Sequence, residues 1–256
     1  MKKAVVITAL ALALAGTLSA FETTKTLSLP AQGLSRFELR TGAGSLTVTG
    51  RDGLTSIEVE AKIVVRGVRD ENMERYLKDR VELTLEKRGD IAVLVSRVRN
   101  AGIIFHFGGD DRIDLTVAVP KTLALEIDDG SGEIVVEDTA AAVRIDDGSG
   151  AVRVERVAGA VRVDDGSGEV FIKDVQGDVV VDDGSGGVEI RDVTGNVAVD
   201  DGSGEIVIRR VGGQVTVDDG SGDIDNVDVE KDVRLIDTGS GDVSVSGEKG
   251  RVIRSS

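Results

Sequence analysis

The stretch D-D-G-S-G at residues 128–132 decides the fold, because it returns along the chain with a fixed period. Its first aspartate occupies six equally spaced positions: Asp128, Asp146, Asp164, Asp182, Asp200 and Asp218. A seventh, altered copy, D-T-G-S-G, begins at Asp237, one position late. Self-similarity at a fixed period is typical of stacked-repeat proteins, in which each repeat buries its apolar face only against its neighbours.

Each unit divides into two equal halves, and both halves alternate between apolar and polar residues. This period of two predicts a strand with one buried face. The apolar residues are almost all Val or Ile, which favour strands over helices. In the unit that spans residues 168–185, the predicted inward positions are Val170, Ile172, Val179 and Val181.

Short strands joined by short turns leave no room for helical crossovers. The pattern therefore predicts an all-β chain in which residues 121–256 form a parallel β-solenoid, or β-helix, with one 18-residue rung per coil. Each strand should pair with its copies in the coils before and after, about 4.8 Å away. Parallel crossovers are right-handed in the great majority of cases, so we expect a right-handed coil.

The two aspartates of each turn have different predicted environments. By the alternation, Asp182 points outward and Asp183 points toward the corner, where its carboxylate can accept hydrogen bonds from backbone N–H groups. Glycine at positions 184 and 186 permits positive φ. We interpret the motif first as a turn-building device.

The alternative interpretation is that the two aspartate columns bind cations such as calcium. Carboxylates about 4.8 Å apart repel each other by only about 0.9 kcal/mol at the dielectric constant of water. A turn hydrogen bond contributes about 1 kcal/mol, so the turns do not require a metal. The candidate metal ligands are Asp128, Asp129, Asp146, Asp147, Asp164, Asp165, Asp182, Asp183, Asp200, Asp201, Asp218 and Asp219.

The N-terminal stretch 1–20 has the pattern of a secretory signal peptide. Lys2 and Lys3 precede an apolar stretch from Ala4 to Gly16, and residues 17–20, which are small except for Leu18, form the predicted cleavage region. An apolar stretch of this length is too short to span a bilayer, and we expect no transmembrane segment in the mature chain. The sequence has no cysteine, which excludes disulfides. We expect an exported protein that is periplasmic, secreted or associated with the cell surface.

The negative charge of the chain is confined to the repeats. Residues 21–120 hold 15 acidic and 15 basic residues, whereas residues 121–256 hold 31 acidic and 14 basic residues, a net charge of −17. An acidic surface argues against nucleic acid as a partner. A solvated acidic surface also keeps a rod-shaped protein soluble.

Residues 21–120 are predicted to be β-rich but irregular. Residues 34–50 repeat the later scheme of alternation, G-x-G and alternation, and are interpreted as an outlying first rung. Asp70 to Arg80 is predicted as a short helix capped by Asp70, with Met73, Tyr76 and Leu77 on an apolar stripe. Strands are predicted at Ile57–Arg66, Val81–Glu86, Ile91–Ser96 and Ile113–Val119. The end of a solenoid exposes unpaired strands, and this region is the candidate cap.

Two local features of this region invite a binding interpretation. The tripeptide R-G-D at Arg88–Asp90 resembles an integrin-recognition sequence, but a charged tight turn explains it more simply. The loop Ile103–Gly109 contains two phenylalanines and the only histidine, His106. We interpret it as an internal strand of the cap, with an exposed apolar tip for a partner or a lipid surface as the alternative.

The exit from Pro120 into K-T-L-A-L-E-I-D-D-G-S-G and the repeated V-D-D-G-S-G-x-V units resemble an exported bacterial family known as putative adhesins. Relatives of that family include the autotransporter adhesin-head domain, and both are β-helical with Gly-Ser-Gly turns. The resemblance covers most of residues 34–254. It implies a β-helical fold and an exported, surface-related role, and it carries over no catalytic residues.

The sequence is compatible with three functions. The first is a non-catalytic, adhesin-like binding or structural rod of the cell envelope, whose partner is an envelope, surface, protein or glycan component. The second is a calcium-loaded rod, because the repeats superficially resemble the calcium β-roll of repeat toxins. There the turn is Gly-Gly-x-Gly-x-Asp, whereas here the aspartates precede the glycines, so the ligand geometry is not inherited.

The third function is a polysaccharide-cleaving β-helix. Such an enzyme needs a distinct carboxylate cluster in a groove. Here every rung carries the same aspartates, and Phe171 is the only aromatic residue of the repeats. Because a residue that is repeated six times builds structure, we predict no enzyme and no cofactor, with calcium as the one ion to test.

Overall fold

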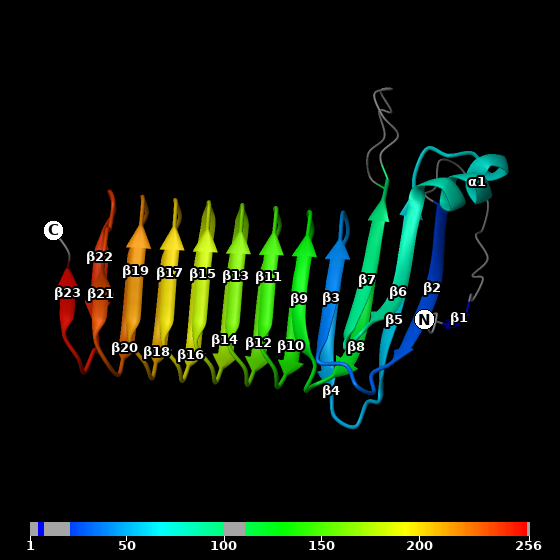
Figure 1. Ribbon diagram of the computed structural model, residues 1–256. Coiled ribbons are helices and arrows are strands. Elements are labelled where there is room, and N and C mark those ends of the chain that lie inside the picture. The colour runs from blue at the N-terminus through cyan, green and yellow to red at the C-terminus, as the bar shows by residue number, and fades with distance from the viewer. Residues whose placement is uncertain (1–4, 8–20, 100–110, 255–256) are drawn as a thin grey trace.

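The structure is a computed structural model that describes residues 5–7, 21–99 and 111–254. It consists of two sheets that run along an elongated coil (Figure 1). Sheet A contains, in spatial order, β23 (Val252–Arg254), β21 (Val233–Leu235), β19 (Val215–Asp219), β17 (Val197–Asp201), β15 (Val179–Asp183), β13 (Val161–Asp165), β11 (Val143–Asp147), β9 (Ala124–Asp129), β3 (Arg36–Thr41), β7 (Ile91–Val98) and β6 (Val81–Arg88).

Sheet B forms the opposite wall of the coil. It contains, in spatial order, β1 (Val5–Ile7), β2 (Phe21–Pro30), β5 (Ser56–Val65), β8 (Arg112–Pro120), β4 (Leu46–Arg51), β10 (Ile134–Thr139), β12 (Val152–Val157), β14 (Gly168–Val175), β16 (Gly186–Val193), β18 (Ile206–Val211), β20 (Ile224–Val229) and β22 (Val243–Ser246).

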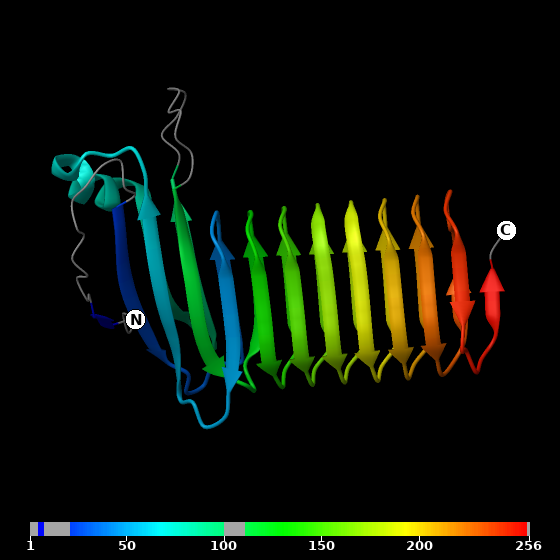
Figure 2. The same cartoon turned by 180° about the vertical axis from the view of Figure 1, so that it is seen from behind.

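The predicted β-solenoid is confirmed, with one strand of each sheet per coil. Val181 lies in register with Val163 and Val199, its copies in the coils before and after. Val181 is 1% exposed, whereas Val180 points away from the core and is half-buried. In Figure 1 the sheet A strands from β9 to β19 run upward while the chain advances to the left. Figure 2 shows the returning sheet B strands from behind, so the coil is right-handed.

A third ladder of buried valines lies at the ends of five sheet B strands, β12 to β20, where the sequence pattern did not predict one. In β16, Val188 and Ile190 point inward, and so does Val193, three residues further on. The reason is Asp192, whose φ of 58° is left-handed and shifts the alternation by one residue. The equivalent left-handed residues are Asp138, Arg156, Asp174, Arg210 and Asp228.

The N-terminal region extends the solenoid and then covers its end. Strands β3 and β4 form a coil that pairs in parallel with β9 and β10 on one side and with β7 and β8 on the other. Beyond that coil the pairing becomes antiparallel, with β6 on β7, β5 on β8 and β2 on β5. The helix α1 (Asp70–Arg80) lies at the same end, near β2 and β6 (Figure 1).

The predicted helix is confirmed, but its predicted cap is wrong. Arg69 occupies the N-cap position without a side-chain capping hydrogen bond, so Asp70 is the first helical residue. Met73 is buried, and Tyr76 and Leu77 pack against the core as predicted. No helix of the described residues is long and apolar enough to cross a membrane. Apart from β1, the predicted signal peptide lies outside the described residues, and so does the Ile103–Gly109 loop with His106.

Candidate functional site

Six buried aspartates form an inner column along the corner between the two sheets. They are between 0 and 5% exposed: Asp129, Asp147, Asp165, Asp183, Asp201 and Asp219. As predicted, the turns use this carboxylate as an acceptor, in five of the six copies; neither carboxylate oxygen of Asp129 has a partner among the described residues. The Ser185 N–H donates to Asp183 Oδ1 at 3.2 Å, and the same bond recurs at 3.0–3.3 Å for Asp147, Asp165, Asp201 and Asp219.

The glycines of the turn are required by the stacking of successive coils. Gly186 has φ of 147°, and a Cβ there would lie 1.5 Å from the carbonyl oxygen of Gly168 in the preceding coil. The predicted positive φ at Gly184 is wrong, since the structure gives it an ordinary backbone conformation. Gly184 is nevertheless needed, because a Cβ would lie 2.6 Å from the Gly166 oxygen.

The second oxygen of each inner carboxylate is unpaired. Among the described residues, Oδ2 of Asp147, Asp165, Asp183, Asp201 and Asp219 has no hydrogen-bond partner. Burial, reinforced by the charge of Asp201 in the next coil, raises the pKa of Asp183 to about 6. Burial likewise raises the pKa of Asp129 to about 7 and that of Asp147 to about 6. The inner column therefore holds protons at a higher pH than free aspartates do.

The outer column lies one residue away and faces solvent. Asp182 and Asp200 are exposed and stand beside each other on neighbouring strands. Among the described residues, no side chain forms an ion pair or hydrogen bond with the outer carboxylates of Asp128, Asp146, Asp164, Asp182, Asp200 and Asp218. One face of the solenoid thus carries a line of carboxylates, one per coil, that have no side-chain partner in the described chain, although Arg144 and Arg162 lie on the same face.

The outer face of sheet B has the opposite character, because its charges are paired. Arg153 contacts Glu155 at 2.9 Å and also lies 4.4 Å from the centre of the Phe171 ring. Arg209 contacts Asp225 at 3.1 Å, and Arg191 pairs with Glu189. Surface ion pairs of this kind contribute little to stability. Each pair nevertheless joins one basic and one acidic side chain, so the paired residues add no net charge to this face.

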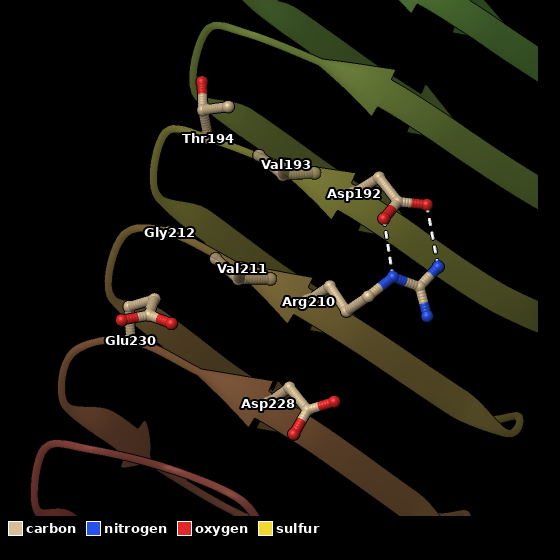
Figure 3. Close-up of a pocket in the computed structure, with 8 residues that line it drawn as sticks. All are labelled: Asp192, Val193, Thr194, Arg210, Val211, Gly212, Asp228 and Glu230. Carbon is tan, nitrogen blue, oxygen red and sulfur yellow. Dashed lines mark hydrogen bonds and ion pairs between the residues drawn. The ribbon is translucent and has the colours of Figure 1, made fainter.

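A shallow hollow lies over the left-handed residues at the end of β16, β18 and β20. Figure 3 shows Arg210 between Asp192 and Asp228, which come from the two neighbouring coils. The Arg210 guanidinium donates two hydrogen bonds to Asp192, at 2.6 and 2.7 Å. This bidentate bond lowers the pKa of Asp192. The side chain of Arg210 is therefore engaged within the chain, and we interpret the hollow as part of the scaffold.

The remaining sequence candidates do not form a site. No three acidic or histidine side chains converge on one point within residues 5–7, 21–99 and 111–254, since the two aspartate columns lie on opposite sides of sheet A. Calcium binding therefore stays a prediction. In the R-G-D turn, Ser35 Oγ donates to Asp90 Oδ2 at 2.6 Å, and Arg88 contacts Glu86 at 3.5 Å. Both charged side chains of that tripeptide have partners in the chain.

The profile of the family described as Toastrack DUF4097 matches residues 56–253. No curated protein matches the chain in sequence. Among solved structures, the chain is similar to a putative lipid binding protein from Parabacteroides distasonis, with 16% identity over 91% of this chain and 97% of that one and a TM-score of 0.47.

Two further similar structures are described as adhesion proteins. A putative adhesin from Bacteroides fragilis has 12% identity over 91% of this chain and 97% of its own, with a TM-score of 0.40. A putative cell adhesion protein from Clostridium sporogenes has 12% identity over 92% of this chain and 99% of its own, with a TM-score of 0.33. None of the three is described as an enzyme, and similarity at this level carries no argument about ligands.

Proposed function

This chain belongs to the Toastrack DUF4097 family, and from that premise we propose that it is an exported, non-catalytic, adhesin-like binding or structural protein of the bacterial cell envelope. Export is supported by the signal-peptide pattern of residues 1–20. The relation to the autotransporter adhesin-head domain belongs to the same proposal and rests on the Gly-Ser-Gly turns.

One observation carries the proposal: the outer aspartates repeat with the coil and have no partner in the described part of the chain. An enzyme requires one place that differs from the rest, whereas this face offers the same carboxylate on six successive coils. A repeated weak contact gains strength by multivalency when the partner is itself extended. The geometry therefore favours an extended envelope component, protein or glycan, that carries positive groups.

The test combines localisation with a matched pair of variants. Fractionation of the native cell should place the protein outside the cytoplasm. Purified protein should bind isolated envelope material, and the triple substitution Asp164→Asn, Asp182→Asn and Asp200→Asn should weaken that binding about 10-fold, since it removes three adjacent carboxylates. The control, Glu133→Gln, Glu169→Gln and Glu205→Gln, changes the net charge equally at three other exposed positions and should alter binding less than twofold.

The outcomes separate the alternatives. Equal losses in both triple variants would show that net charge alone attracts the envelope, and the outer column would lose its assigned role. Binding that requires calcium, and that a chelator abolishes, would favour the calcium-loaded rod instead. A cytoplasmic location would contradict the proposal as a whole.

A further inference from the structure

The two ends of the solenoid differ in how they are covered. At the N-terminal end, antiparallel strands and α1 lie over the coil. At the C-terminal end, β22 pairs only with β20, and β23 pairs only with β21. Within the described residues no element lies beyond these two strands, as the left side of Figure 1 shows. Their outer edges present unpaired backbone N–H and C=O groups, which can extend a sheet.

This end also exposes apolar side chains. Ile236 and Val252, which are 45% and 39% exposed, are the two large exposed apolar residues of the described chain, and both lie in the last coil and a half. Val243 and Val245 are half-buried, although the residues that hold their ladder positions in the coils before are buried. No described residue covers the core at this end.

The charge pattern changes at the same place. Leu235 lies in register with Val217, so Ile236 takes the place of an outer aspartate, Asp218. Residues 230–256 hold 5 acidic and 5 basic residues, whereas residues 121–229 hold 26 acidic and 9 basic residues. Along the rest of the solenoid, like charge would oppose the approach of a second copy. At the last coil that repulsion is absent.

From these observations we infer that the C-terminal end of the solenoid is a docking surface for a second copy of this chain. A two-fold axis perpendicular to the long axis of the coil would place β22 antiparallel to β22 of the second copy and β23 antiparallel to β23. Both sheets and the apolar core would then continue across the junction, and Val252, which lies in register with the inward Val233, would lose contact with water. This surface is separate from the outer aspartate column, so the inference does not depend on the proposed function.

The expected association is weak. The end of one coil offers less than the about 800 Å² per partner of a standard interface, so we expect a dissociation constant in the micromolar range rather than the nanomolar range. The neutral last coil favours a second copy over a strongly charged partner. A contact through the same patch on both copies closes as a dimer and cannot grow into a filament.

Sedimentation velocity over a concentration series tests the association. The purified chain should pass from monomer to dimer and should form no larger species. Val252→Lys places a charge on the open edge and should raise the dissociation constant at least 10-fold. Val207→Lys is the matched control, because it adds the same charge to an outward, half-buried position in an interior coil, and it should leave the constant within twofold. Ile236→Asp, which restores the aspartate of the other coils, should also weaken the dimer.

Cross-linking identifies which end is joined. Because the chain has no cysteine, Ser244→Cys on β22 introduces a single thiol and should yield a disulfide-linked dimer under mild oxidation. Ser28→Cys on β2, at the opposite end, should stay monomeric. A protein that remains monomeric up to about 1 mM would overturn the inference, as would dimers that form only through position 28. Equal weakening by Val252→Lys and Val207→Lys would overturn it too, because the effect would then come from net charge.

Discussion

Asp182 and Asp183 are neighbours in sequence, but one is exposed to solvent and the other is buried. Asp182 belongs to the outer column, is exposed and has no side-chain partner in the described chain. Asp183 is 2% exposed, accepts a hydrogen bond from the Ser185 N–H and has a pKa raised by burial. One step along a strand moves a side chain from one face of the sheet to the other. The same pair of residues therefore supplies both a charged surface and a structural corner, and each can be changed without the other.

The largest expected effect comes from placing a charge on the inner face of sheet A, at position 181, rather than on its outer face, at position 180. Val181→Asp places an unpaired carboxylate among the valines of the core and should destabilise the fold by several kcal/mol. Val180→Asp adds the same group to the outward face and should have little effect. Thermal unfolding of the two variants measures the difference. Equal melting temperatures would mean that the assigned register is wrong.

The next effect separates the two columns directly. Asp183→Ala removes the acceptor for the Ser185 N–H and should destabilise the protein by roughly 1–3 kcal/mol. Asp182→Ala removes an exposed carboxylate that repels its copies in the next coils, so it should be neutral or slightly stabilising. Chemical denaturation of both variants at pH 5 gives the comparison, since the pKa of Asp183 is raised to about 6 and its carboxyl group is largely protonated there. A larger loss in Asp182→Ala would refute the turn-building role.

The contrast between the columns also predicts a dependence of stability on pH. Burial raises the pKa of Asp183 to about 6 and that of Asp129 to about 7, above the about 3.9 of an unfolded aspartate. The folded state therefore binds protons that the unfolded chain releases. The resulting stabilisation is complete below about pH 4 and is lost as the pH rises through 6 to 7.

We expect the melting temperature to rise as the pH falls from 8 to 5. Below about pH 4 the trend should reverse, because the arginine hydrogen bonds that lower the pKa of Asp138 and Asp192 are lost on protonation. Asp147→Asn, Asp165→Asn and Asp183→Asn together should flatten the rise between pH 8 and 5. The matched outer triple, Asp146→Asn, Asp164→Asn and Asp182→Asn, should keep most of it. If the outer triple flattens the rise instead, surface repulsion is its cause.

The repeat explains why so much of the solenoid could be predicted from the sequence. A fixed period and strict alternation define the ladders of Val181 and its copies, the environments of Asp182 and Asp183, and the stacking of coils. The third ladder escaped prediction because Asp192 and Arg210 adopt a left-handed conformation that is usual for glycine and unusual for these residues. The signal that could have revealed it is a valine that breaks the alternation at the same place in five successive units, as Val193 does.

The N-terminal region was less predictable because its pairings are long-range. Its strands and helix follow from local pattern, but the placement of β7 and β8 against β3 and β4 joins segments that lie far apart in the sequence. The unpaired Oδ2 of Asp183 is likewise a consequence of packing between coils. Asn226 is a further feature that the local pattern does not explain. It replaces an apolar ladder residue and lies in register with Ile208 and Val245. It is buried, and neither of its side-chain polar atoms is paired in the described structure.

The smallest expected effect concerns cations, and it sharpens the comparison between the columns. Calcium should raise the melting temperature only slightly, and magnesium at the same ionic strength should do the same, because both screen the repulsion between stacked outer carboxylates. A true site behaves differently, since a ligand at 100 times its dissociation constant adds about 2.7 kcal/mol, which corresponds to about 5–10 °C for a chain of this size. Asp182→Ala should reduce the small screening effect, and Asp183→Ala should leave it unchanged, because only the outer column faces the ions. A calcium-selective rise of about 5 °C or more that is lost on chelation and in both variants would mean that the two columns act together as metal ligands. Asp182 and Asp183 would then not have separate roles.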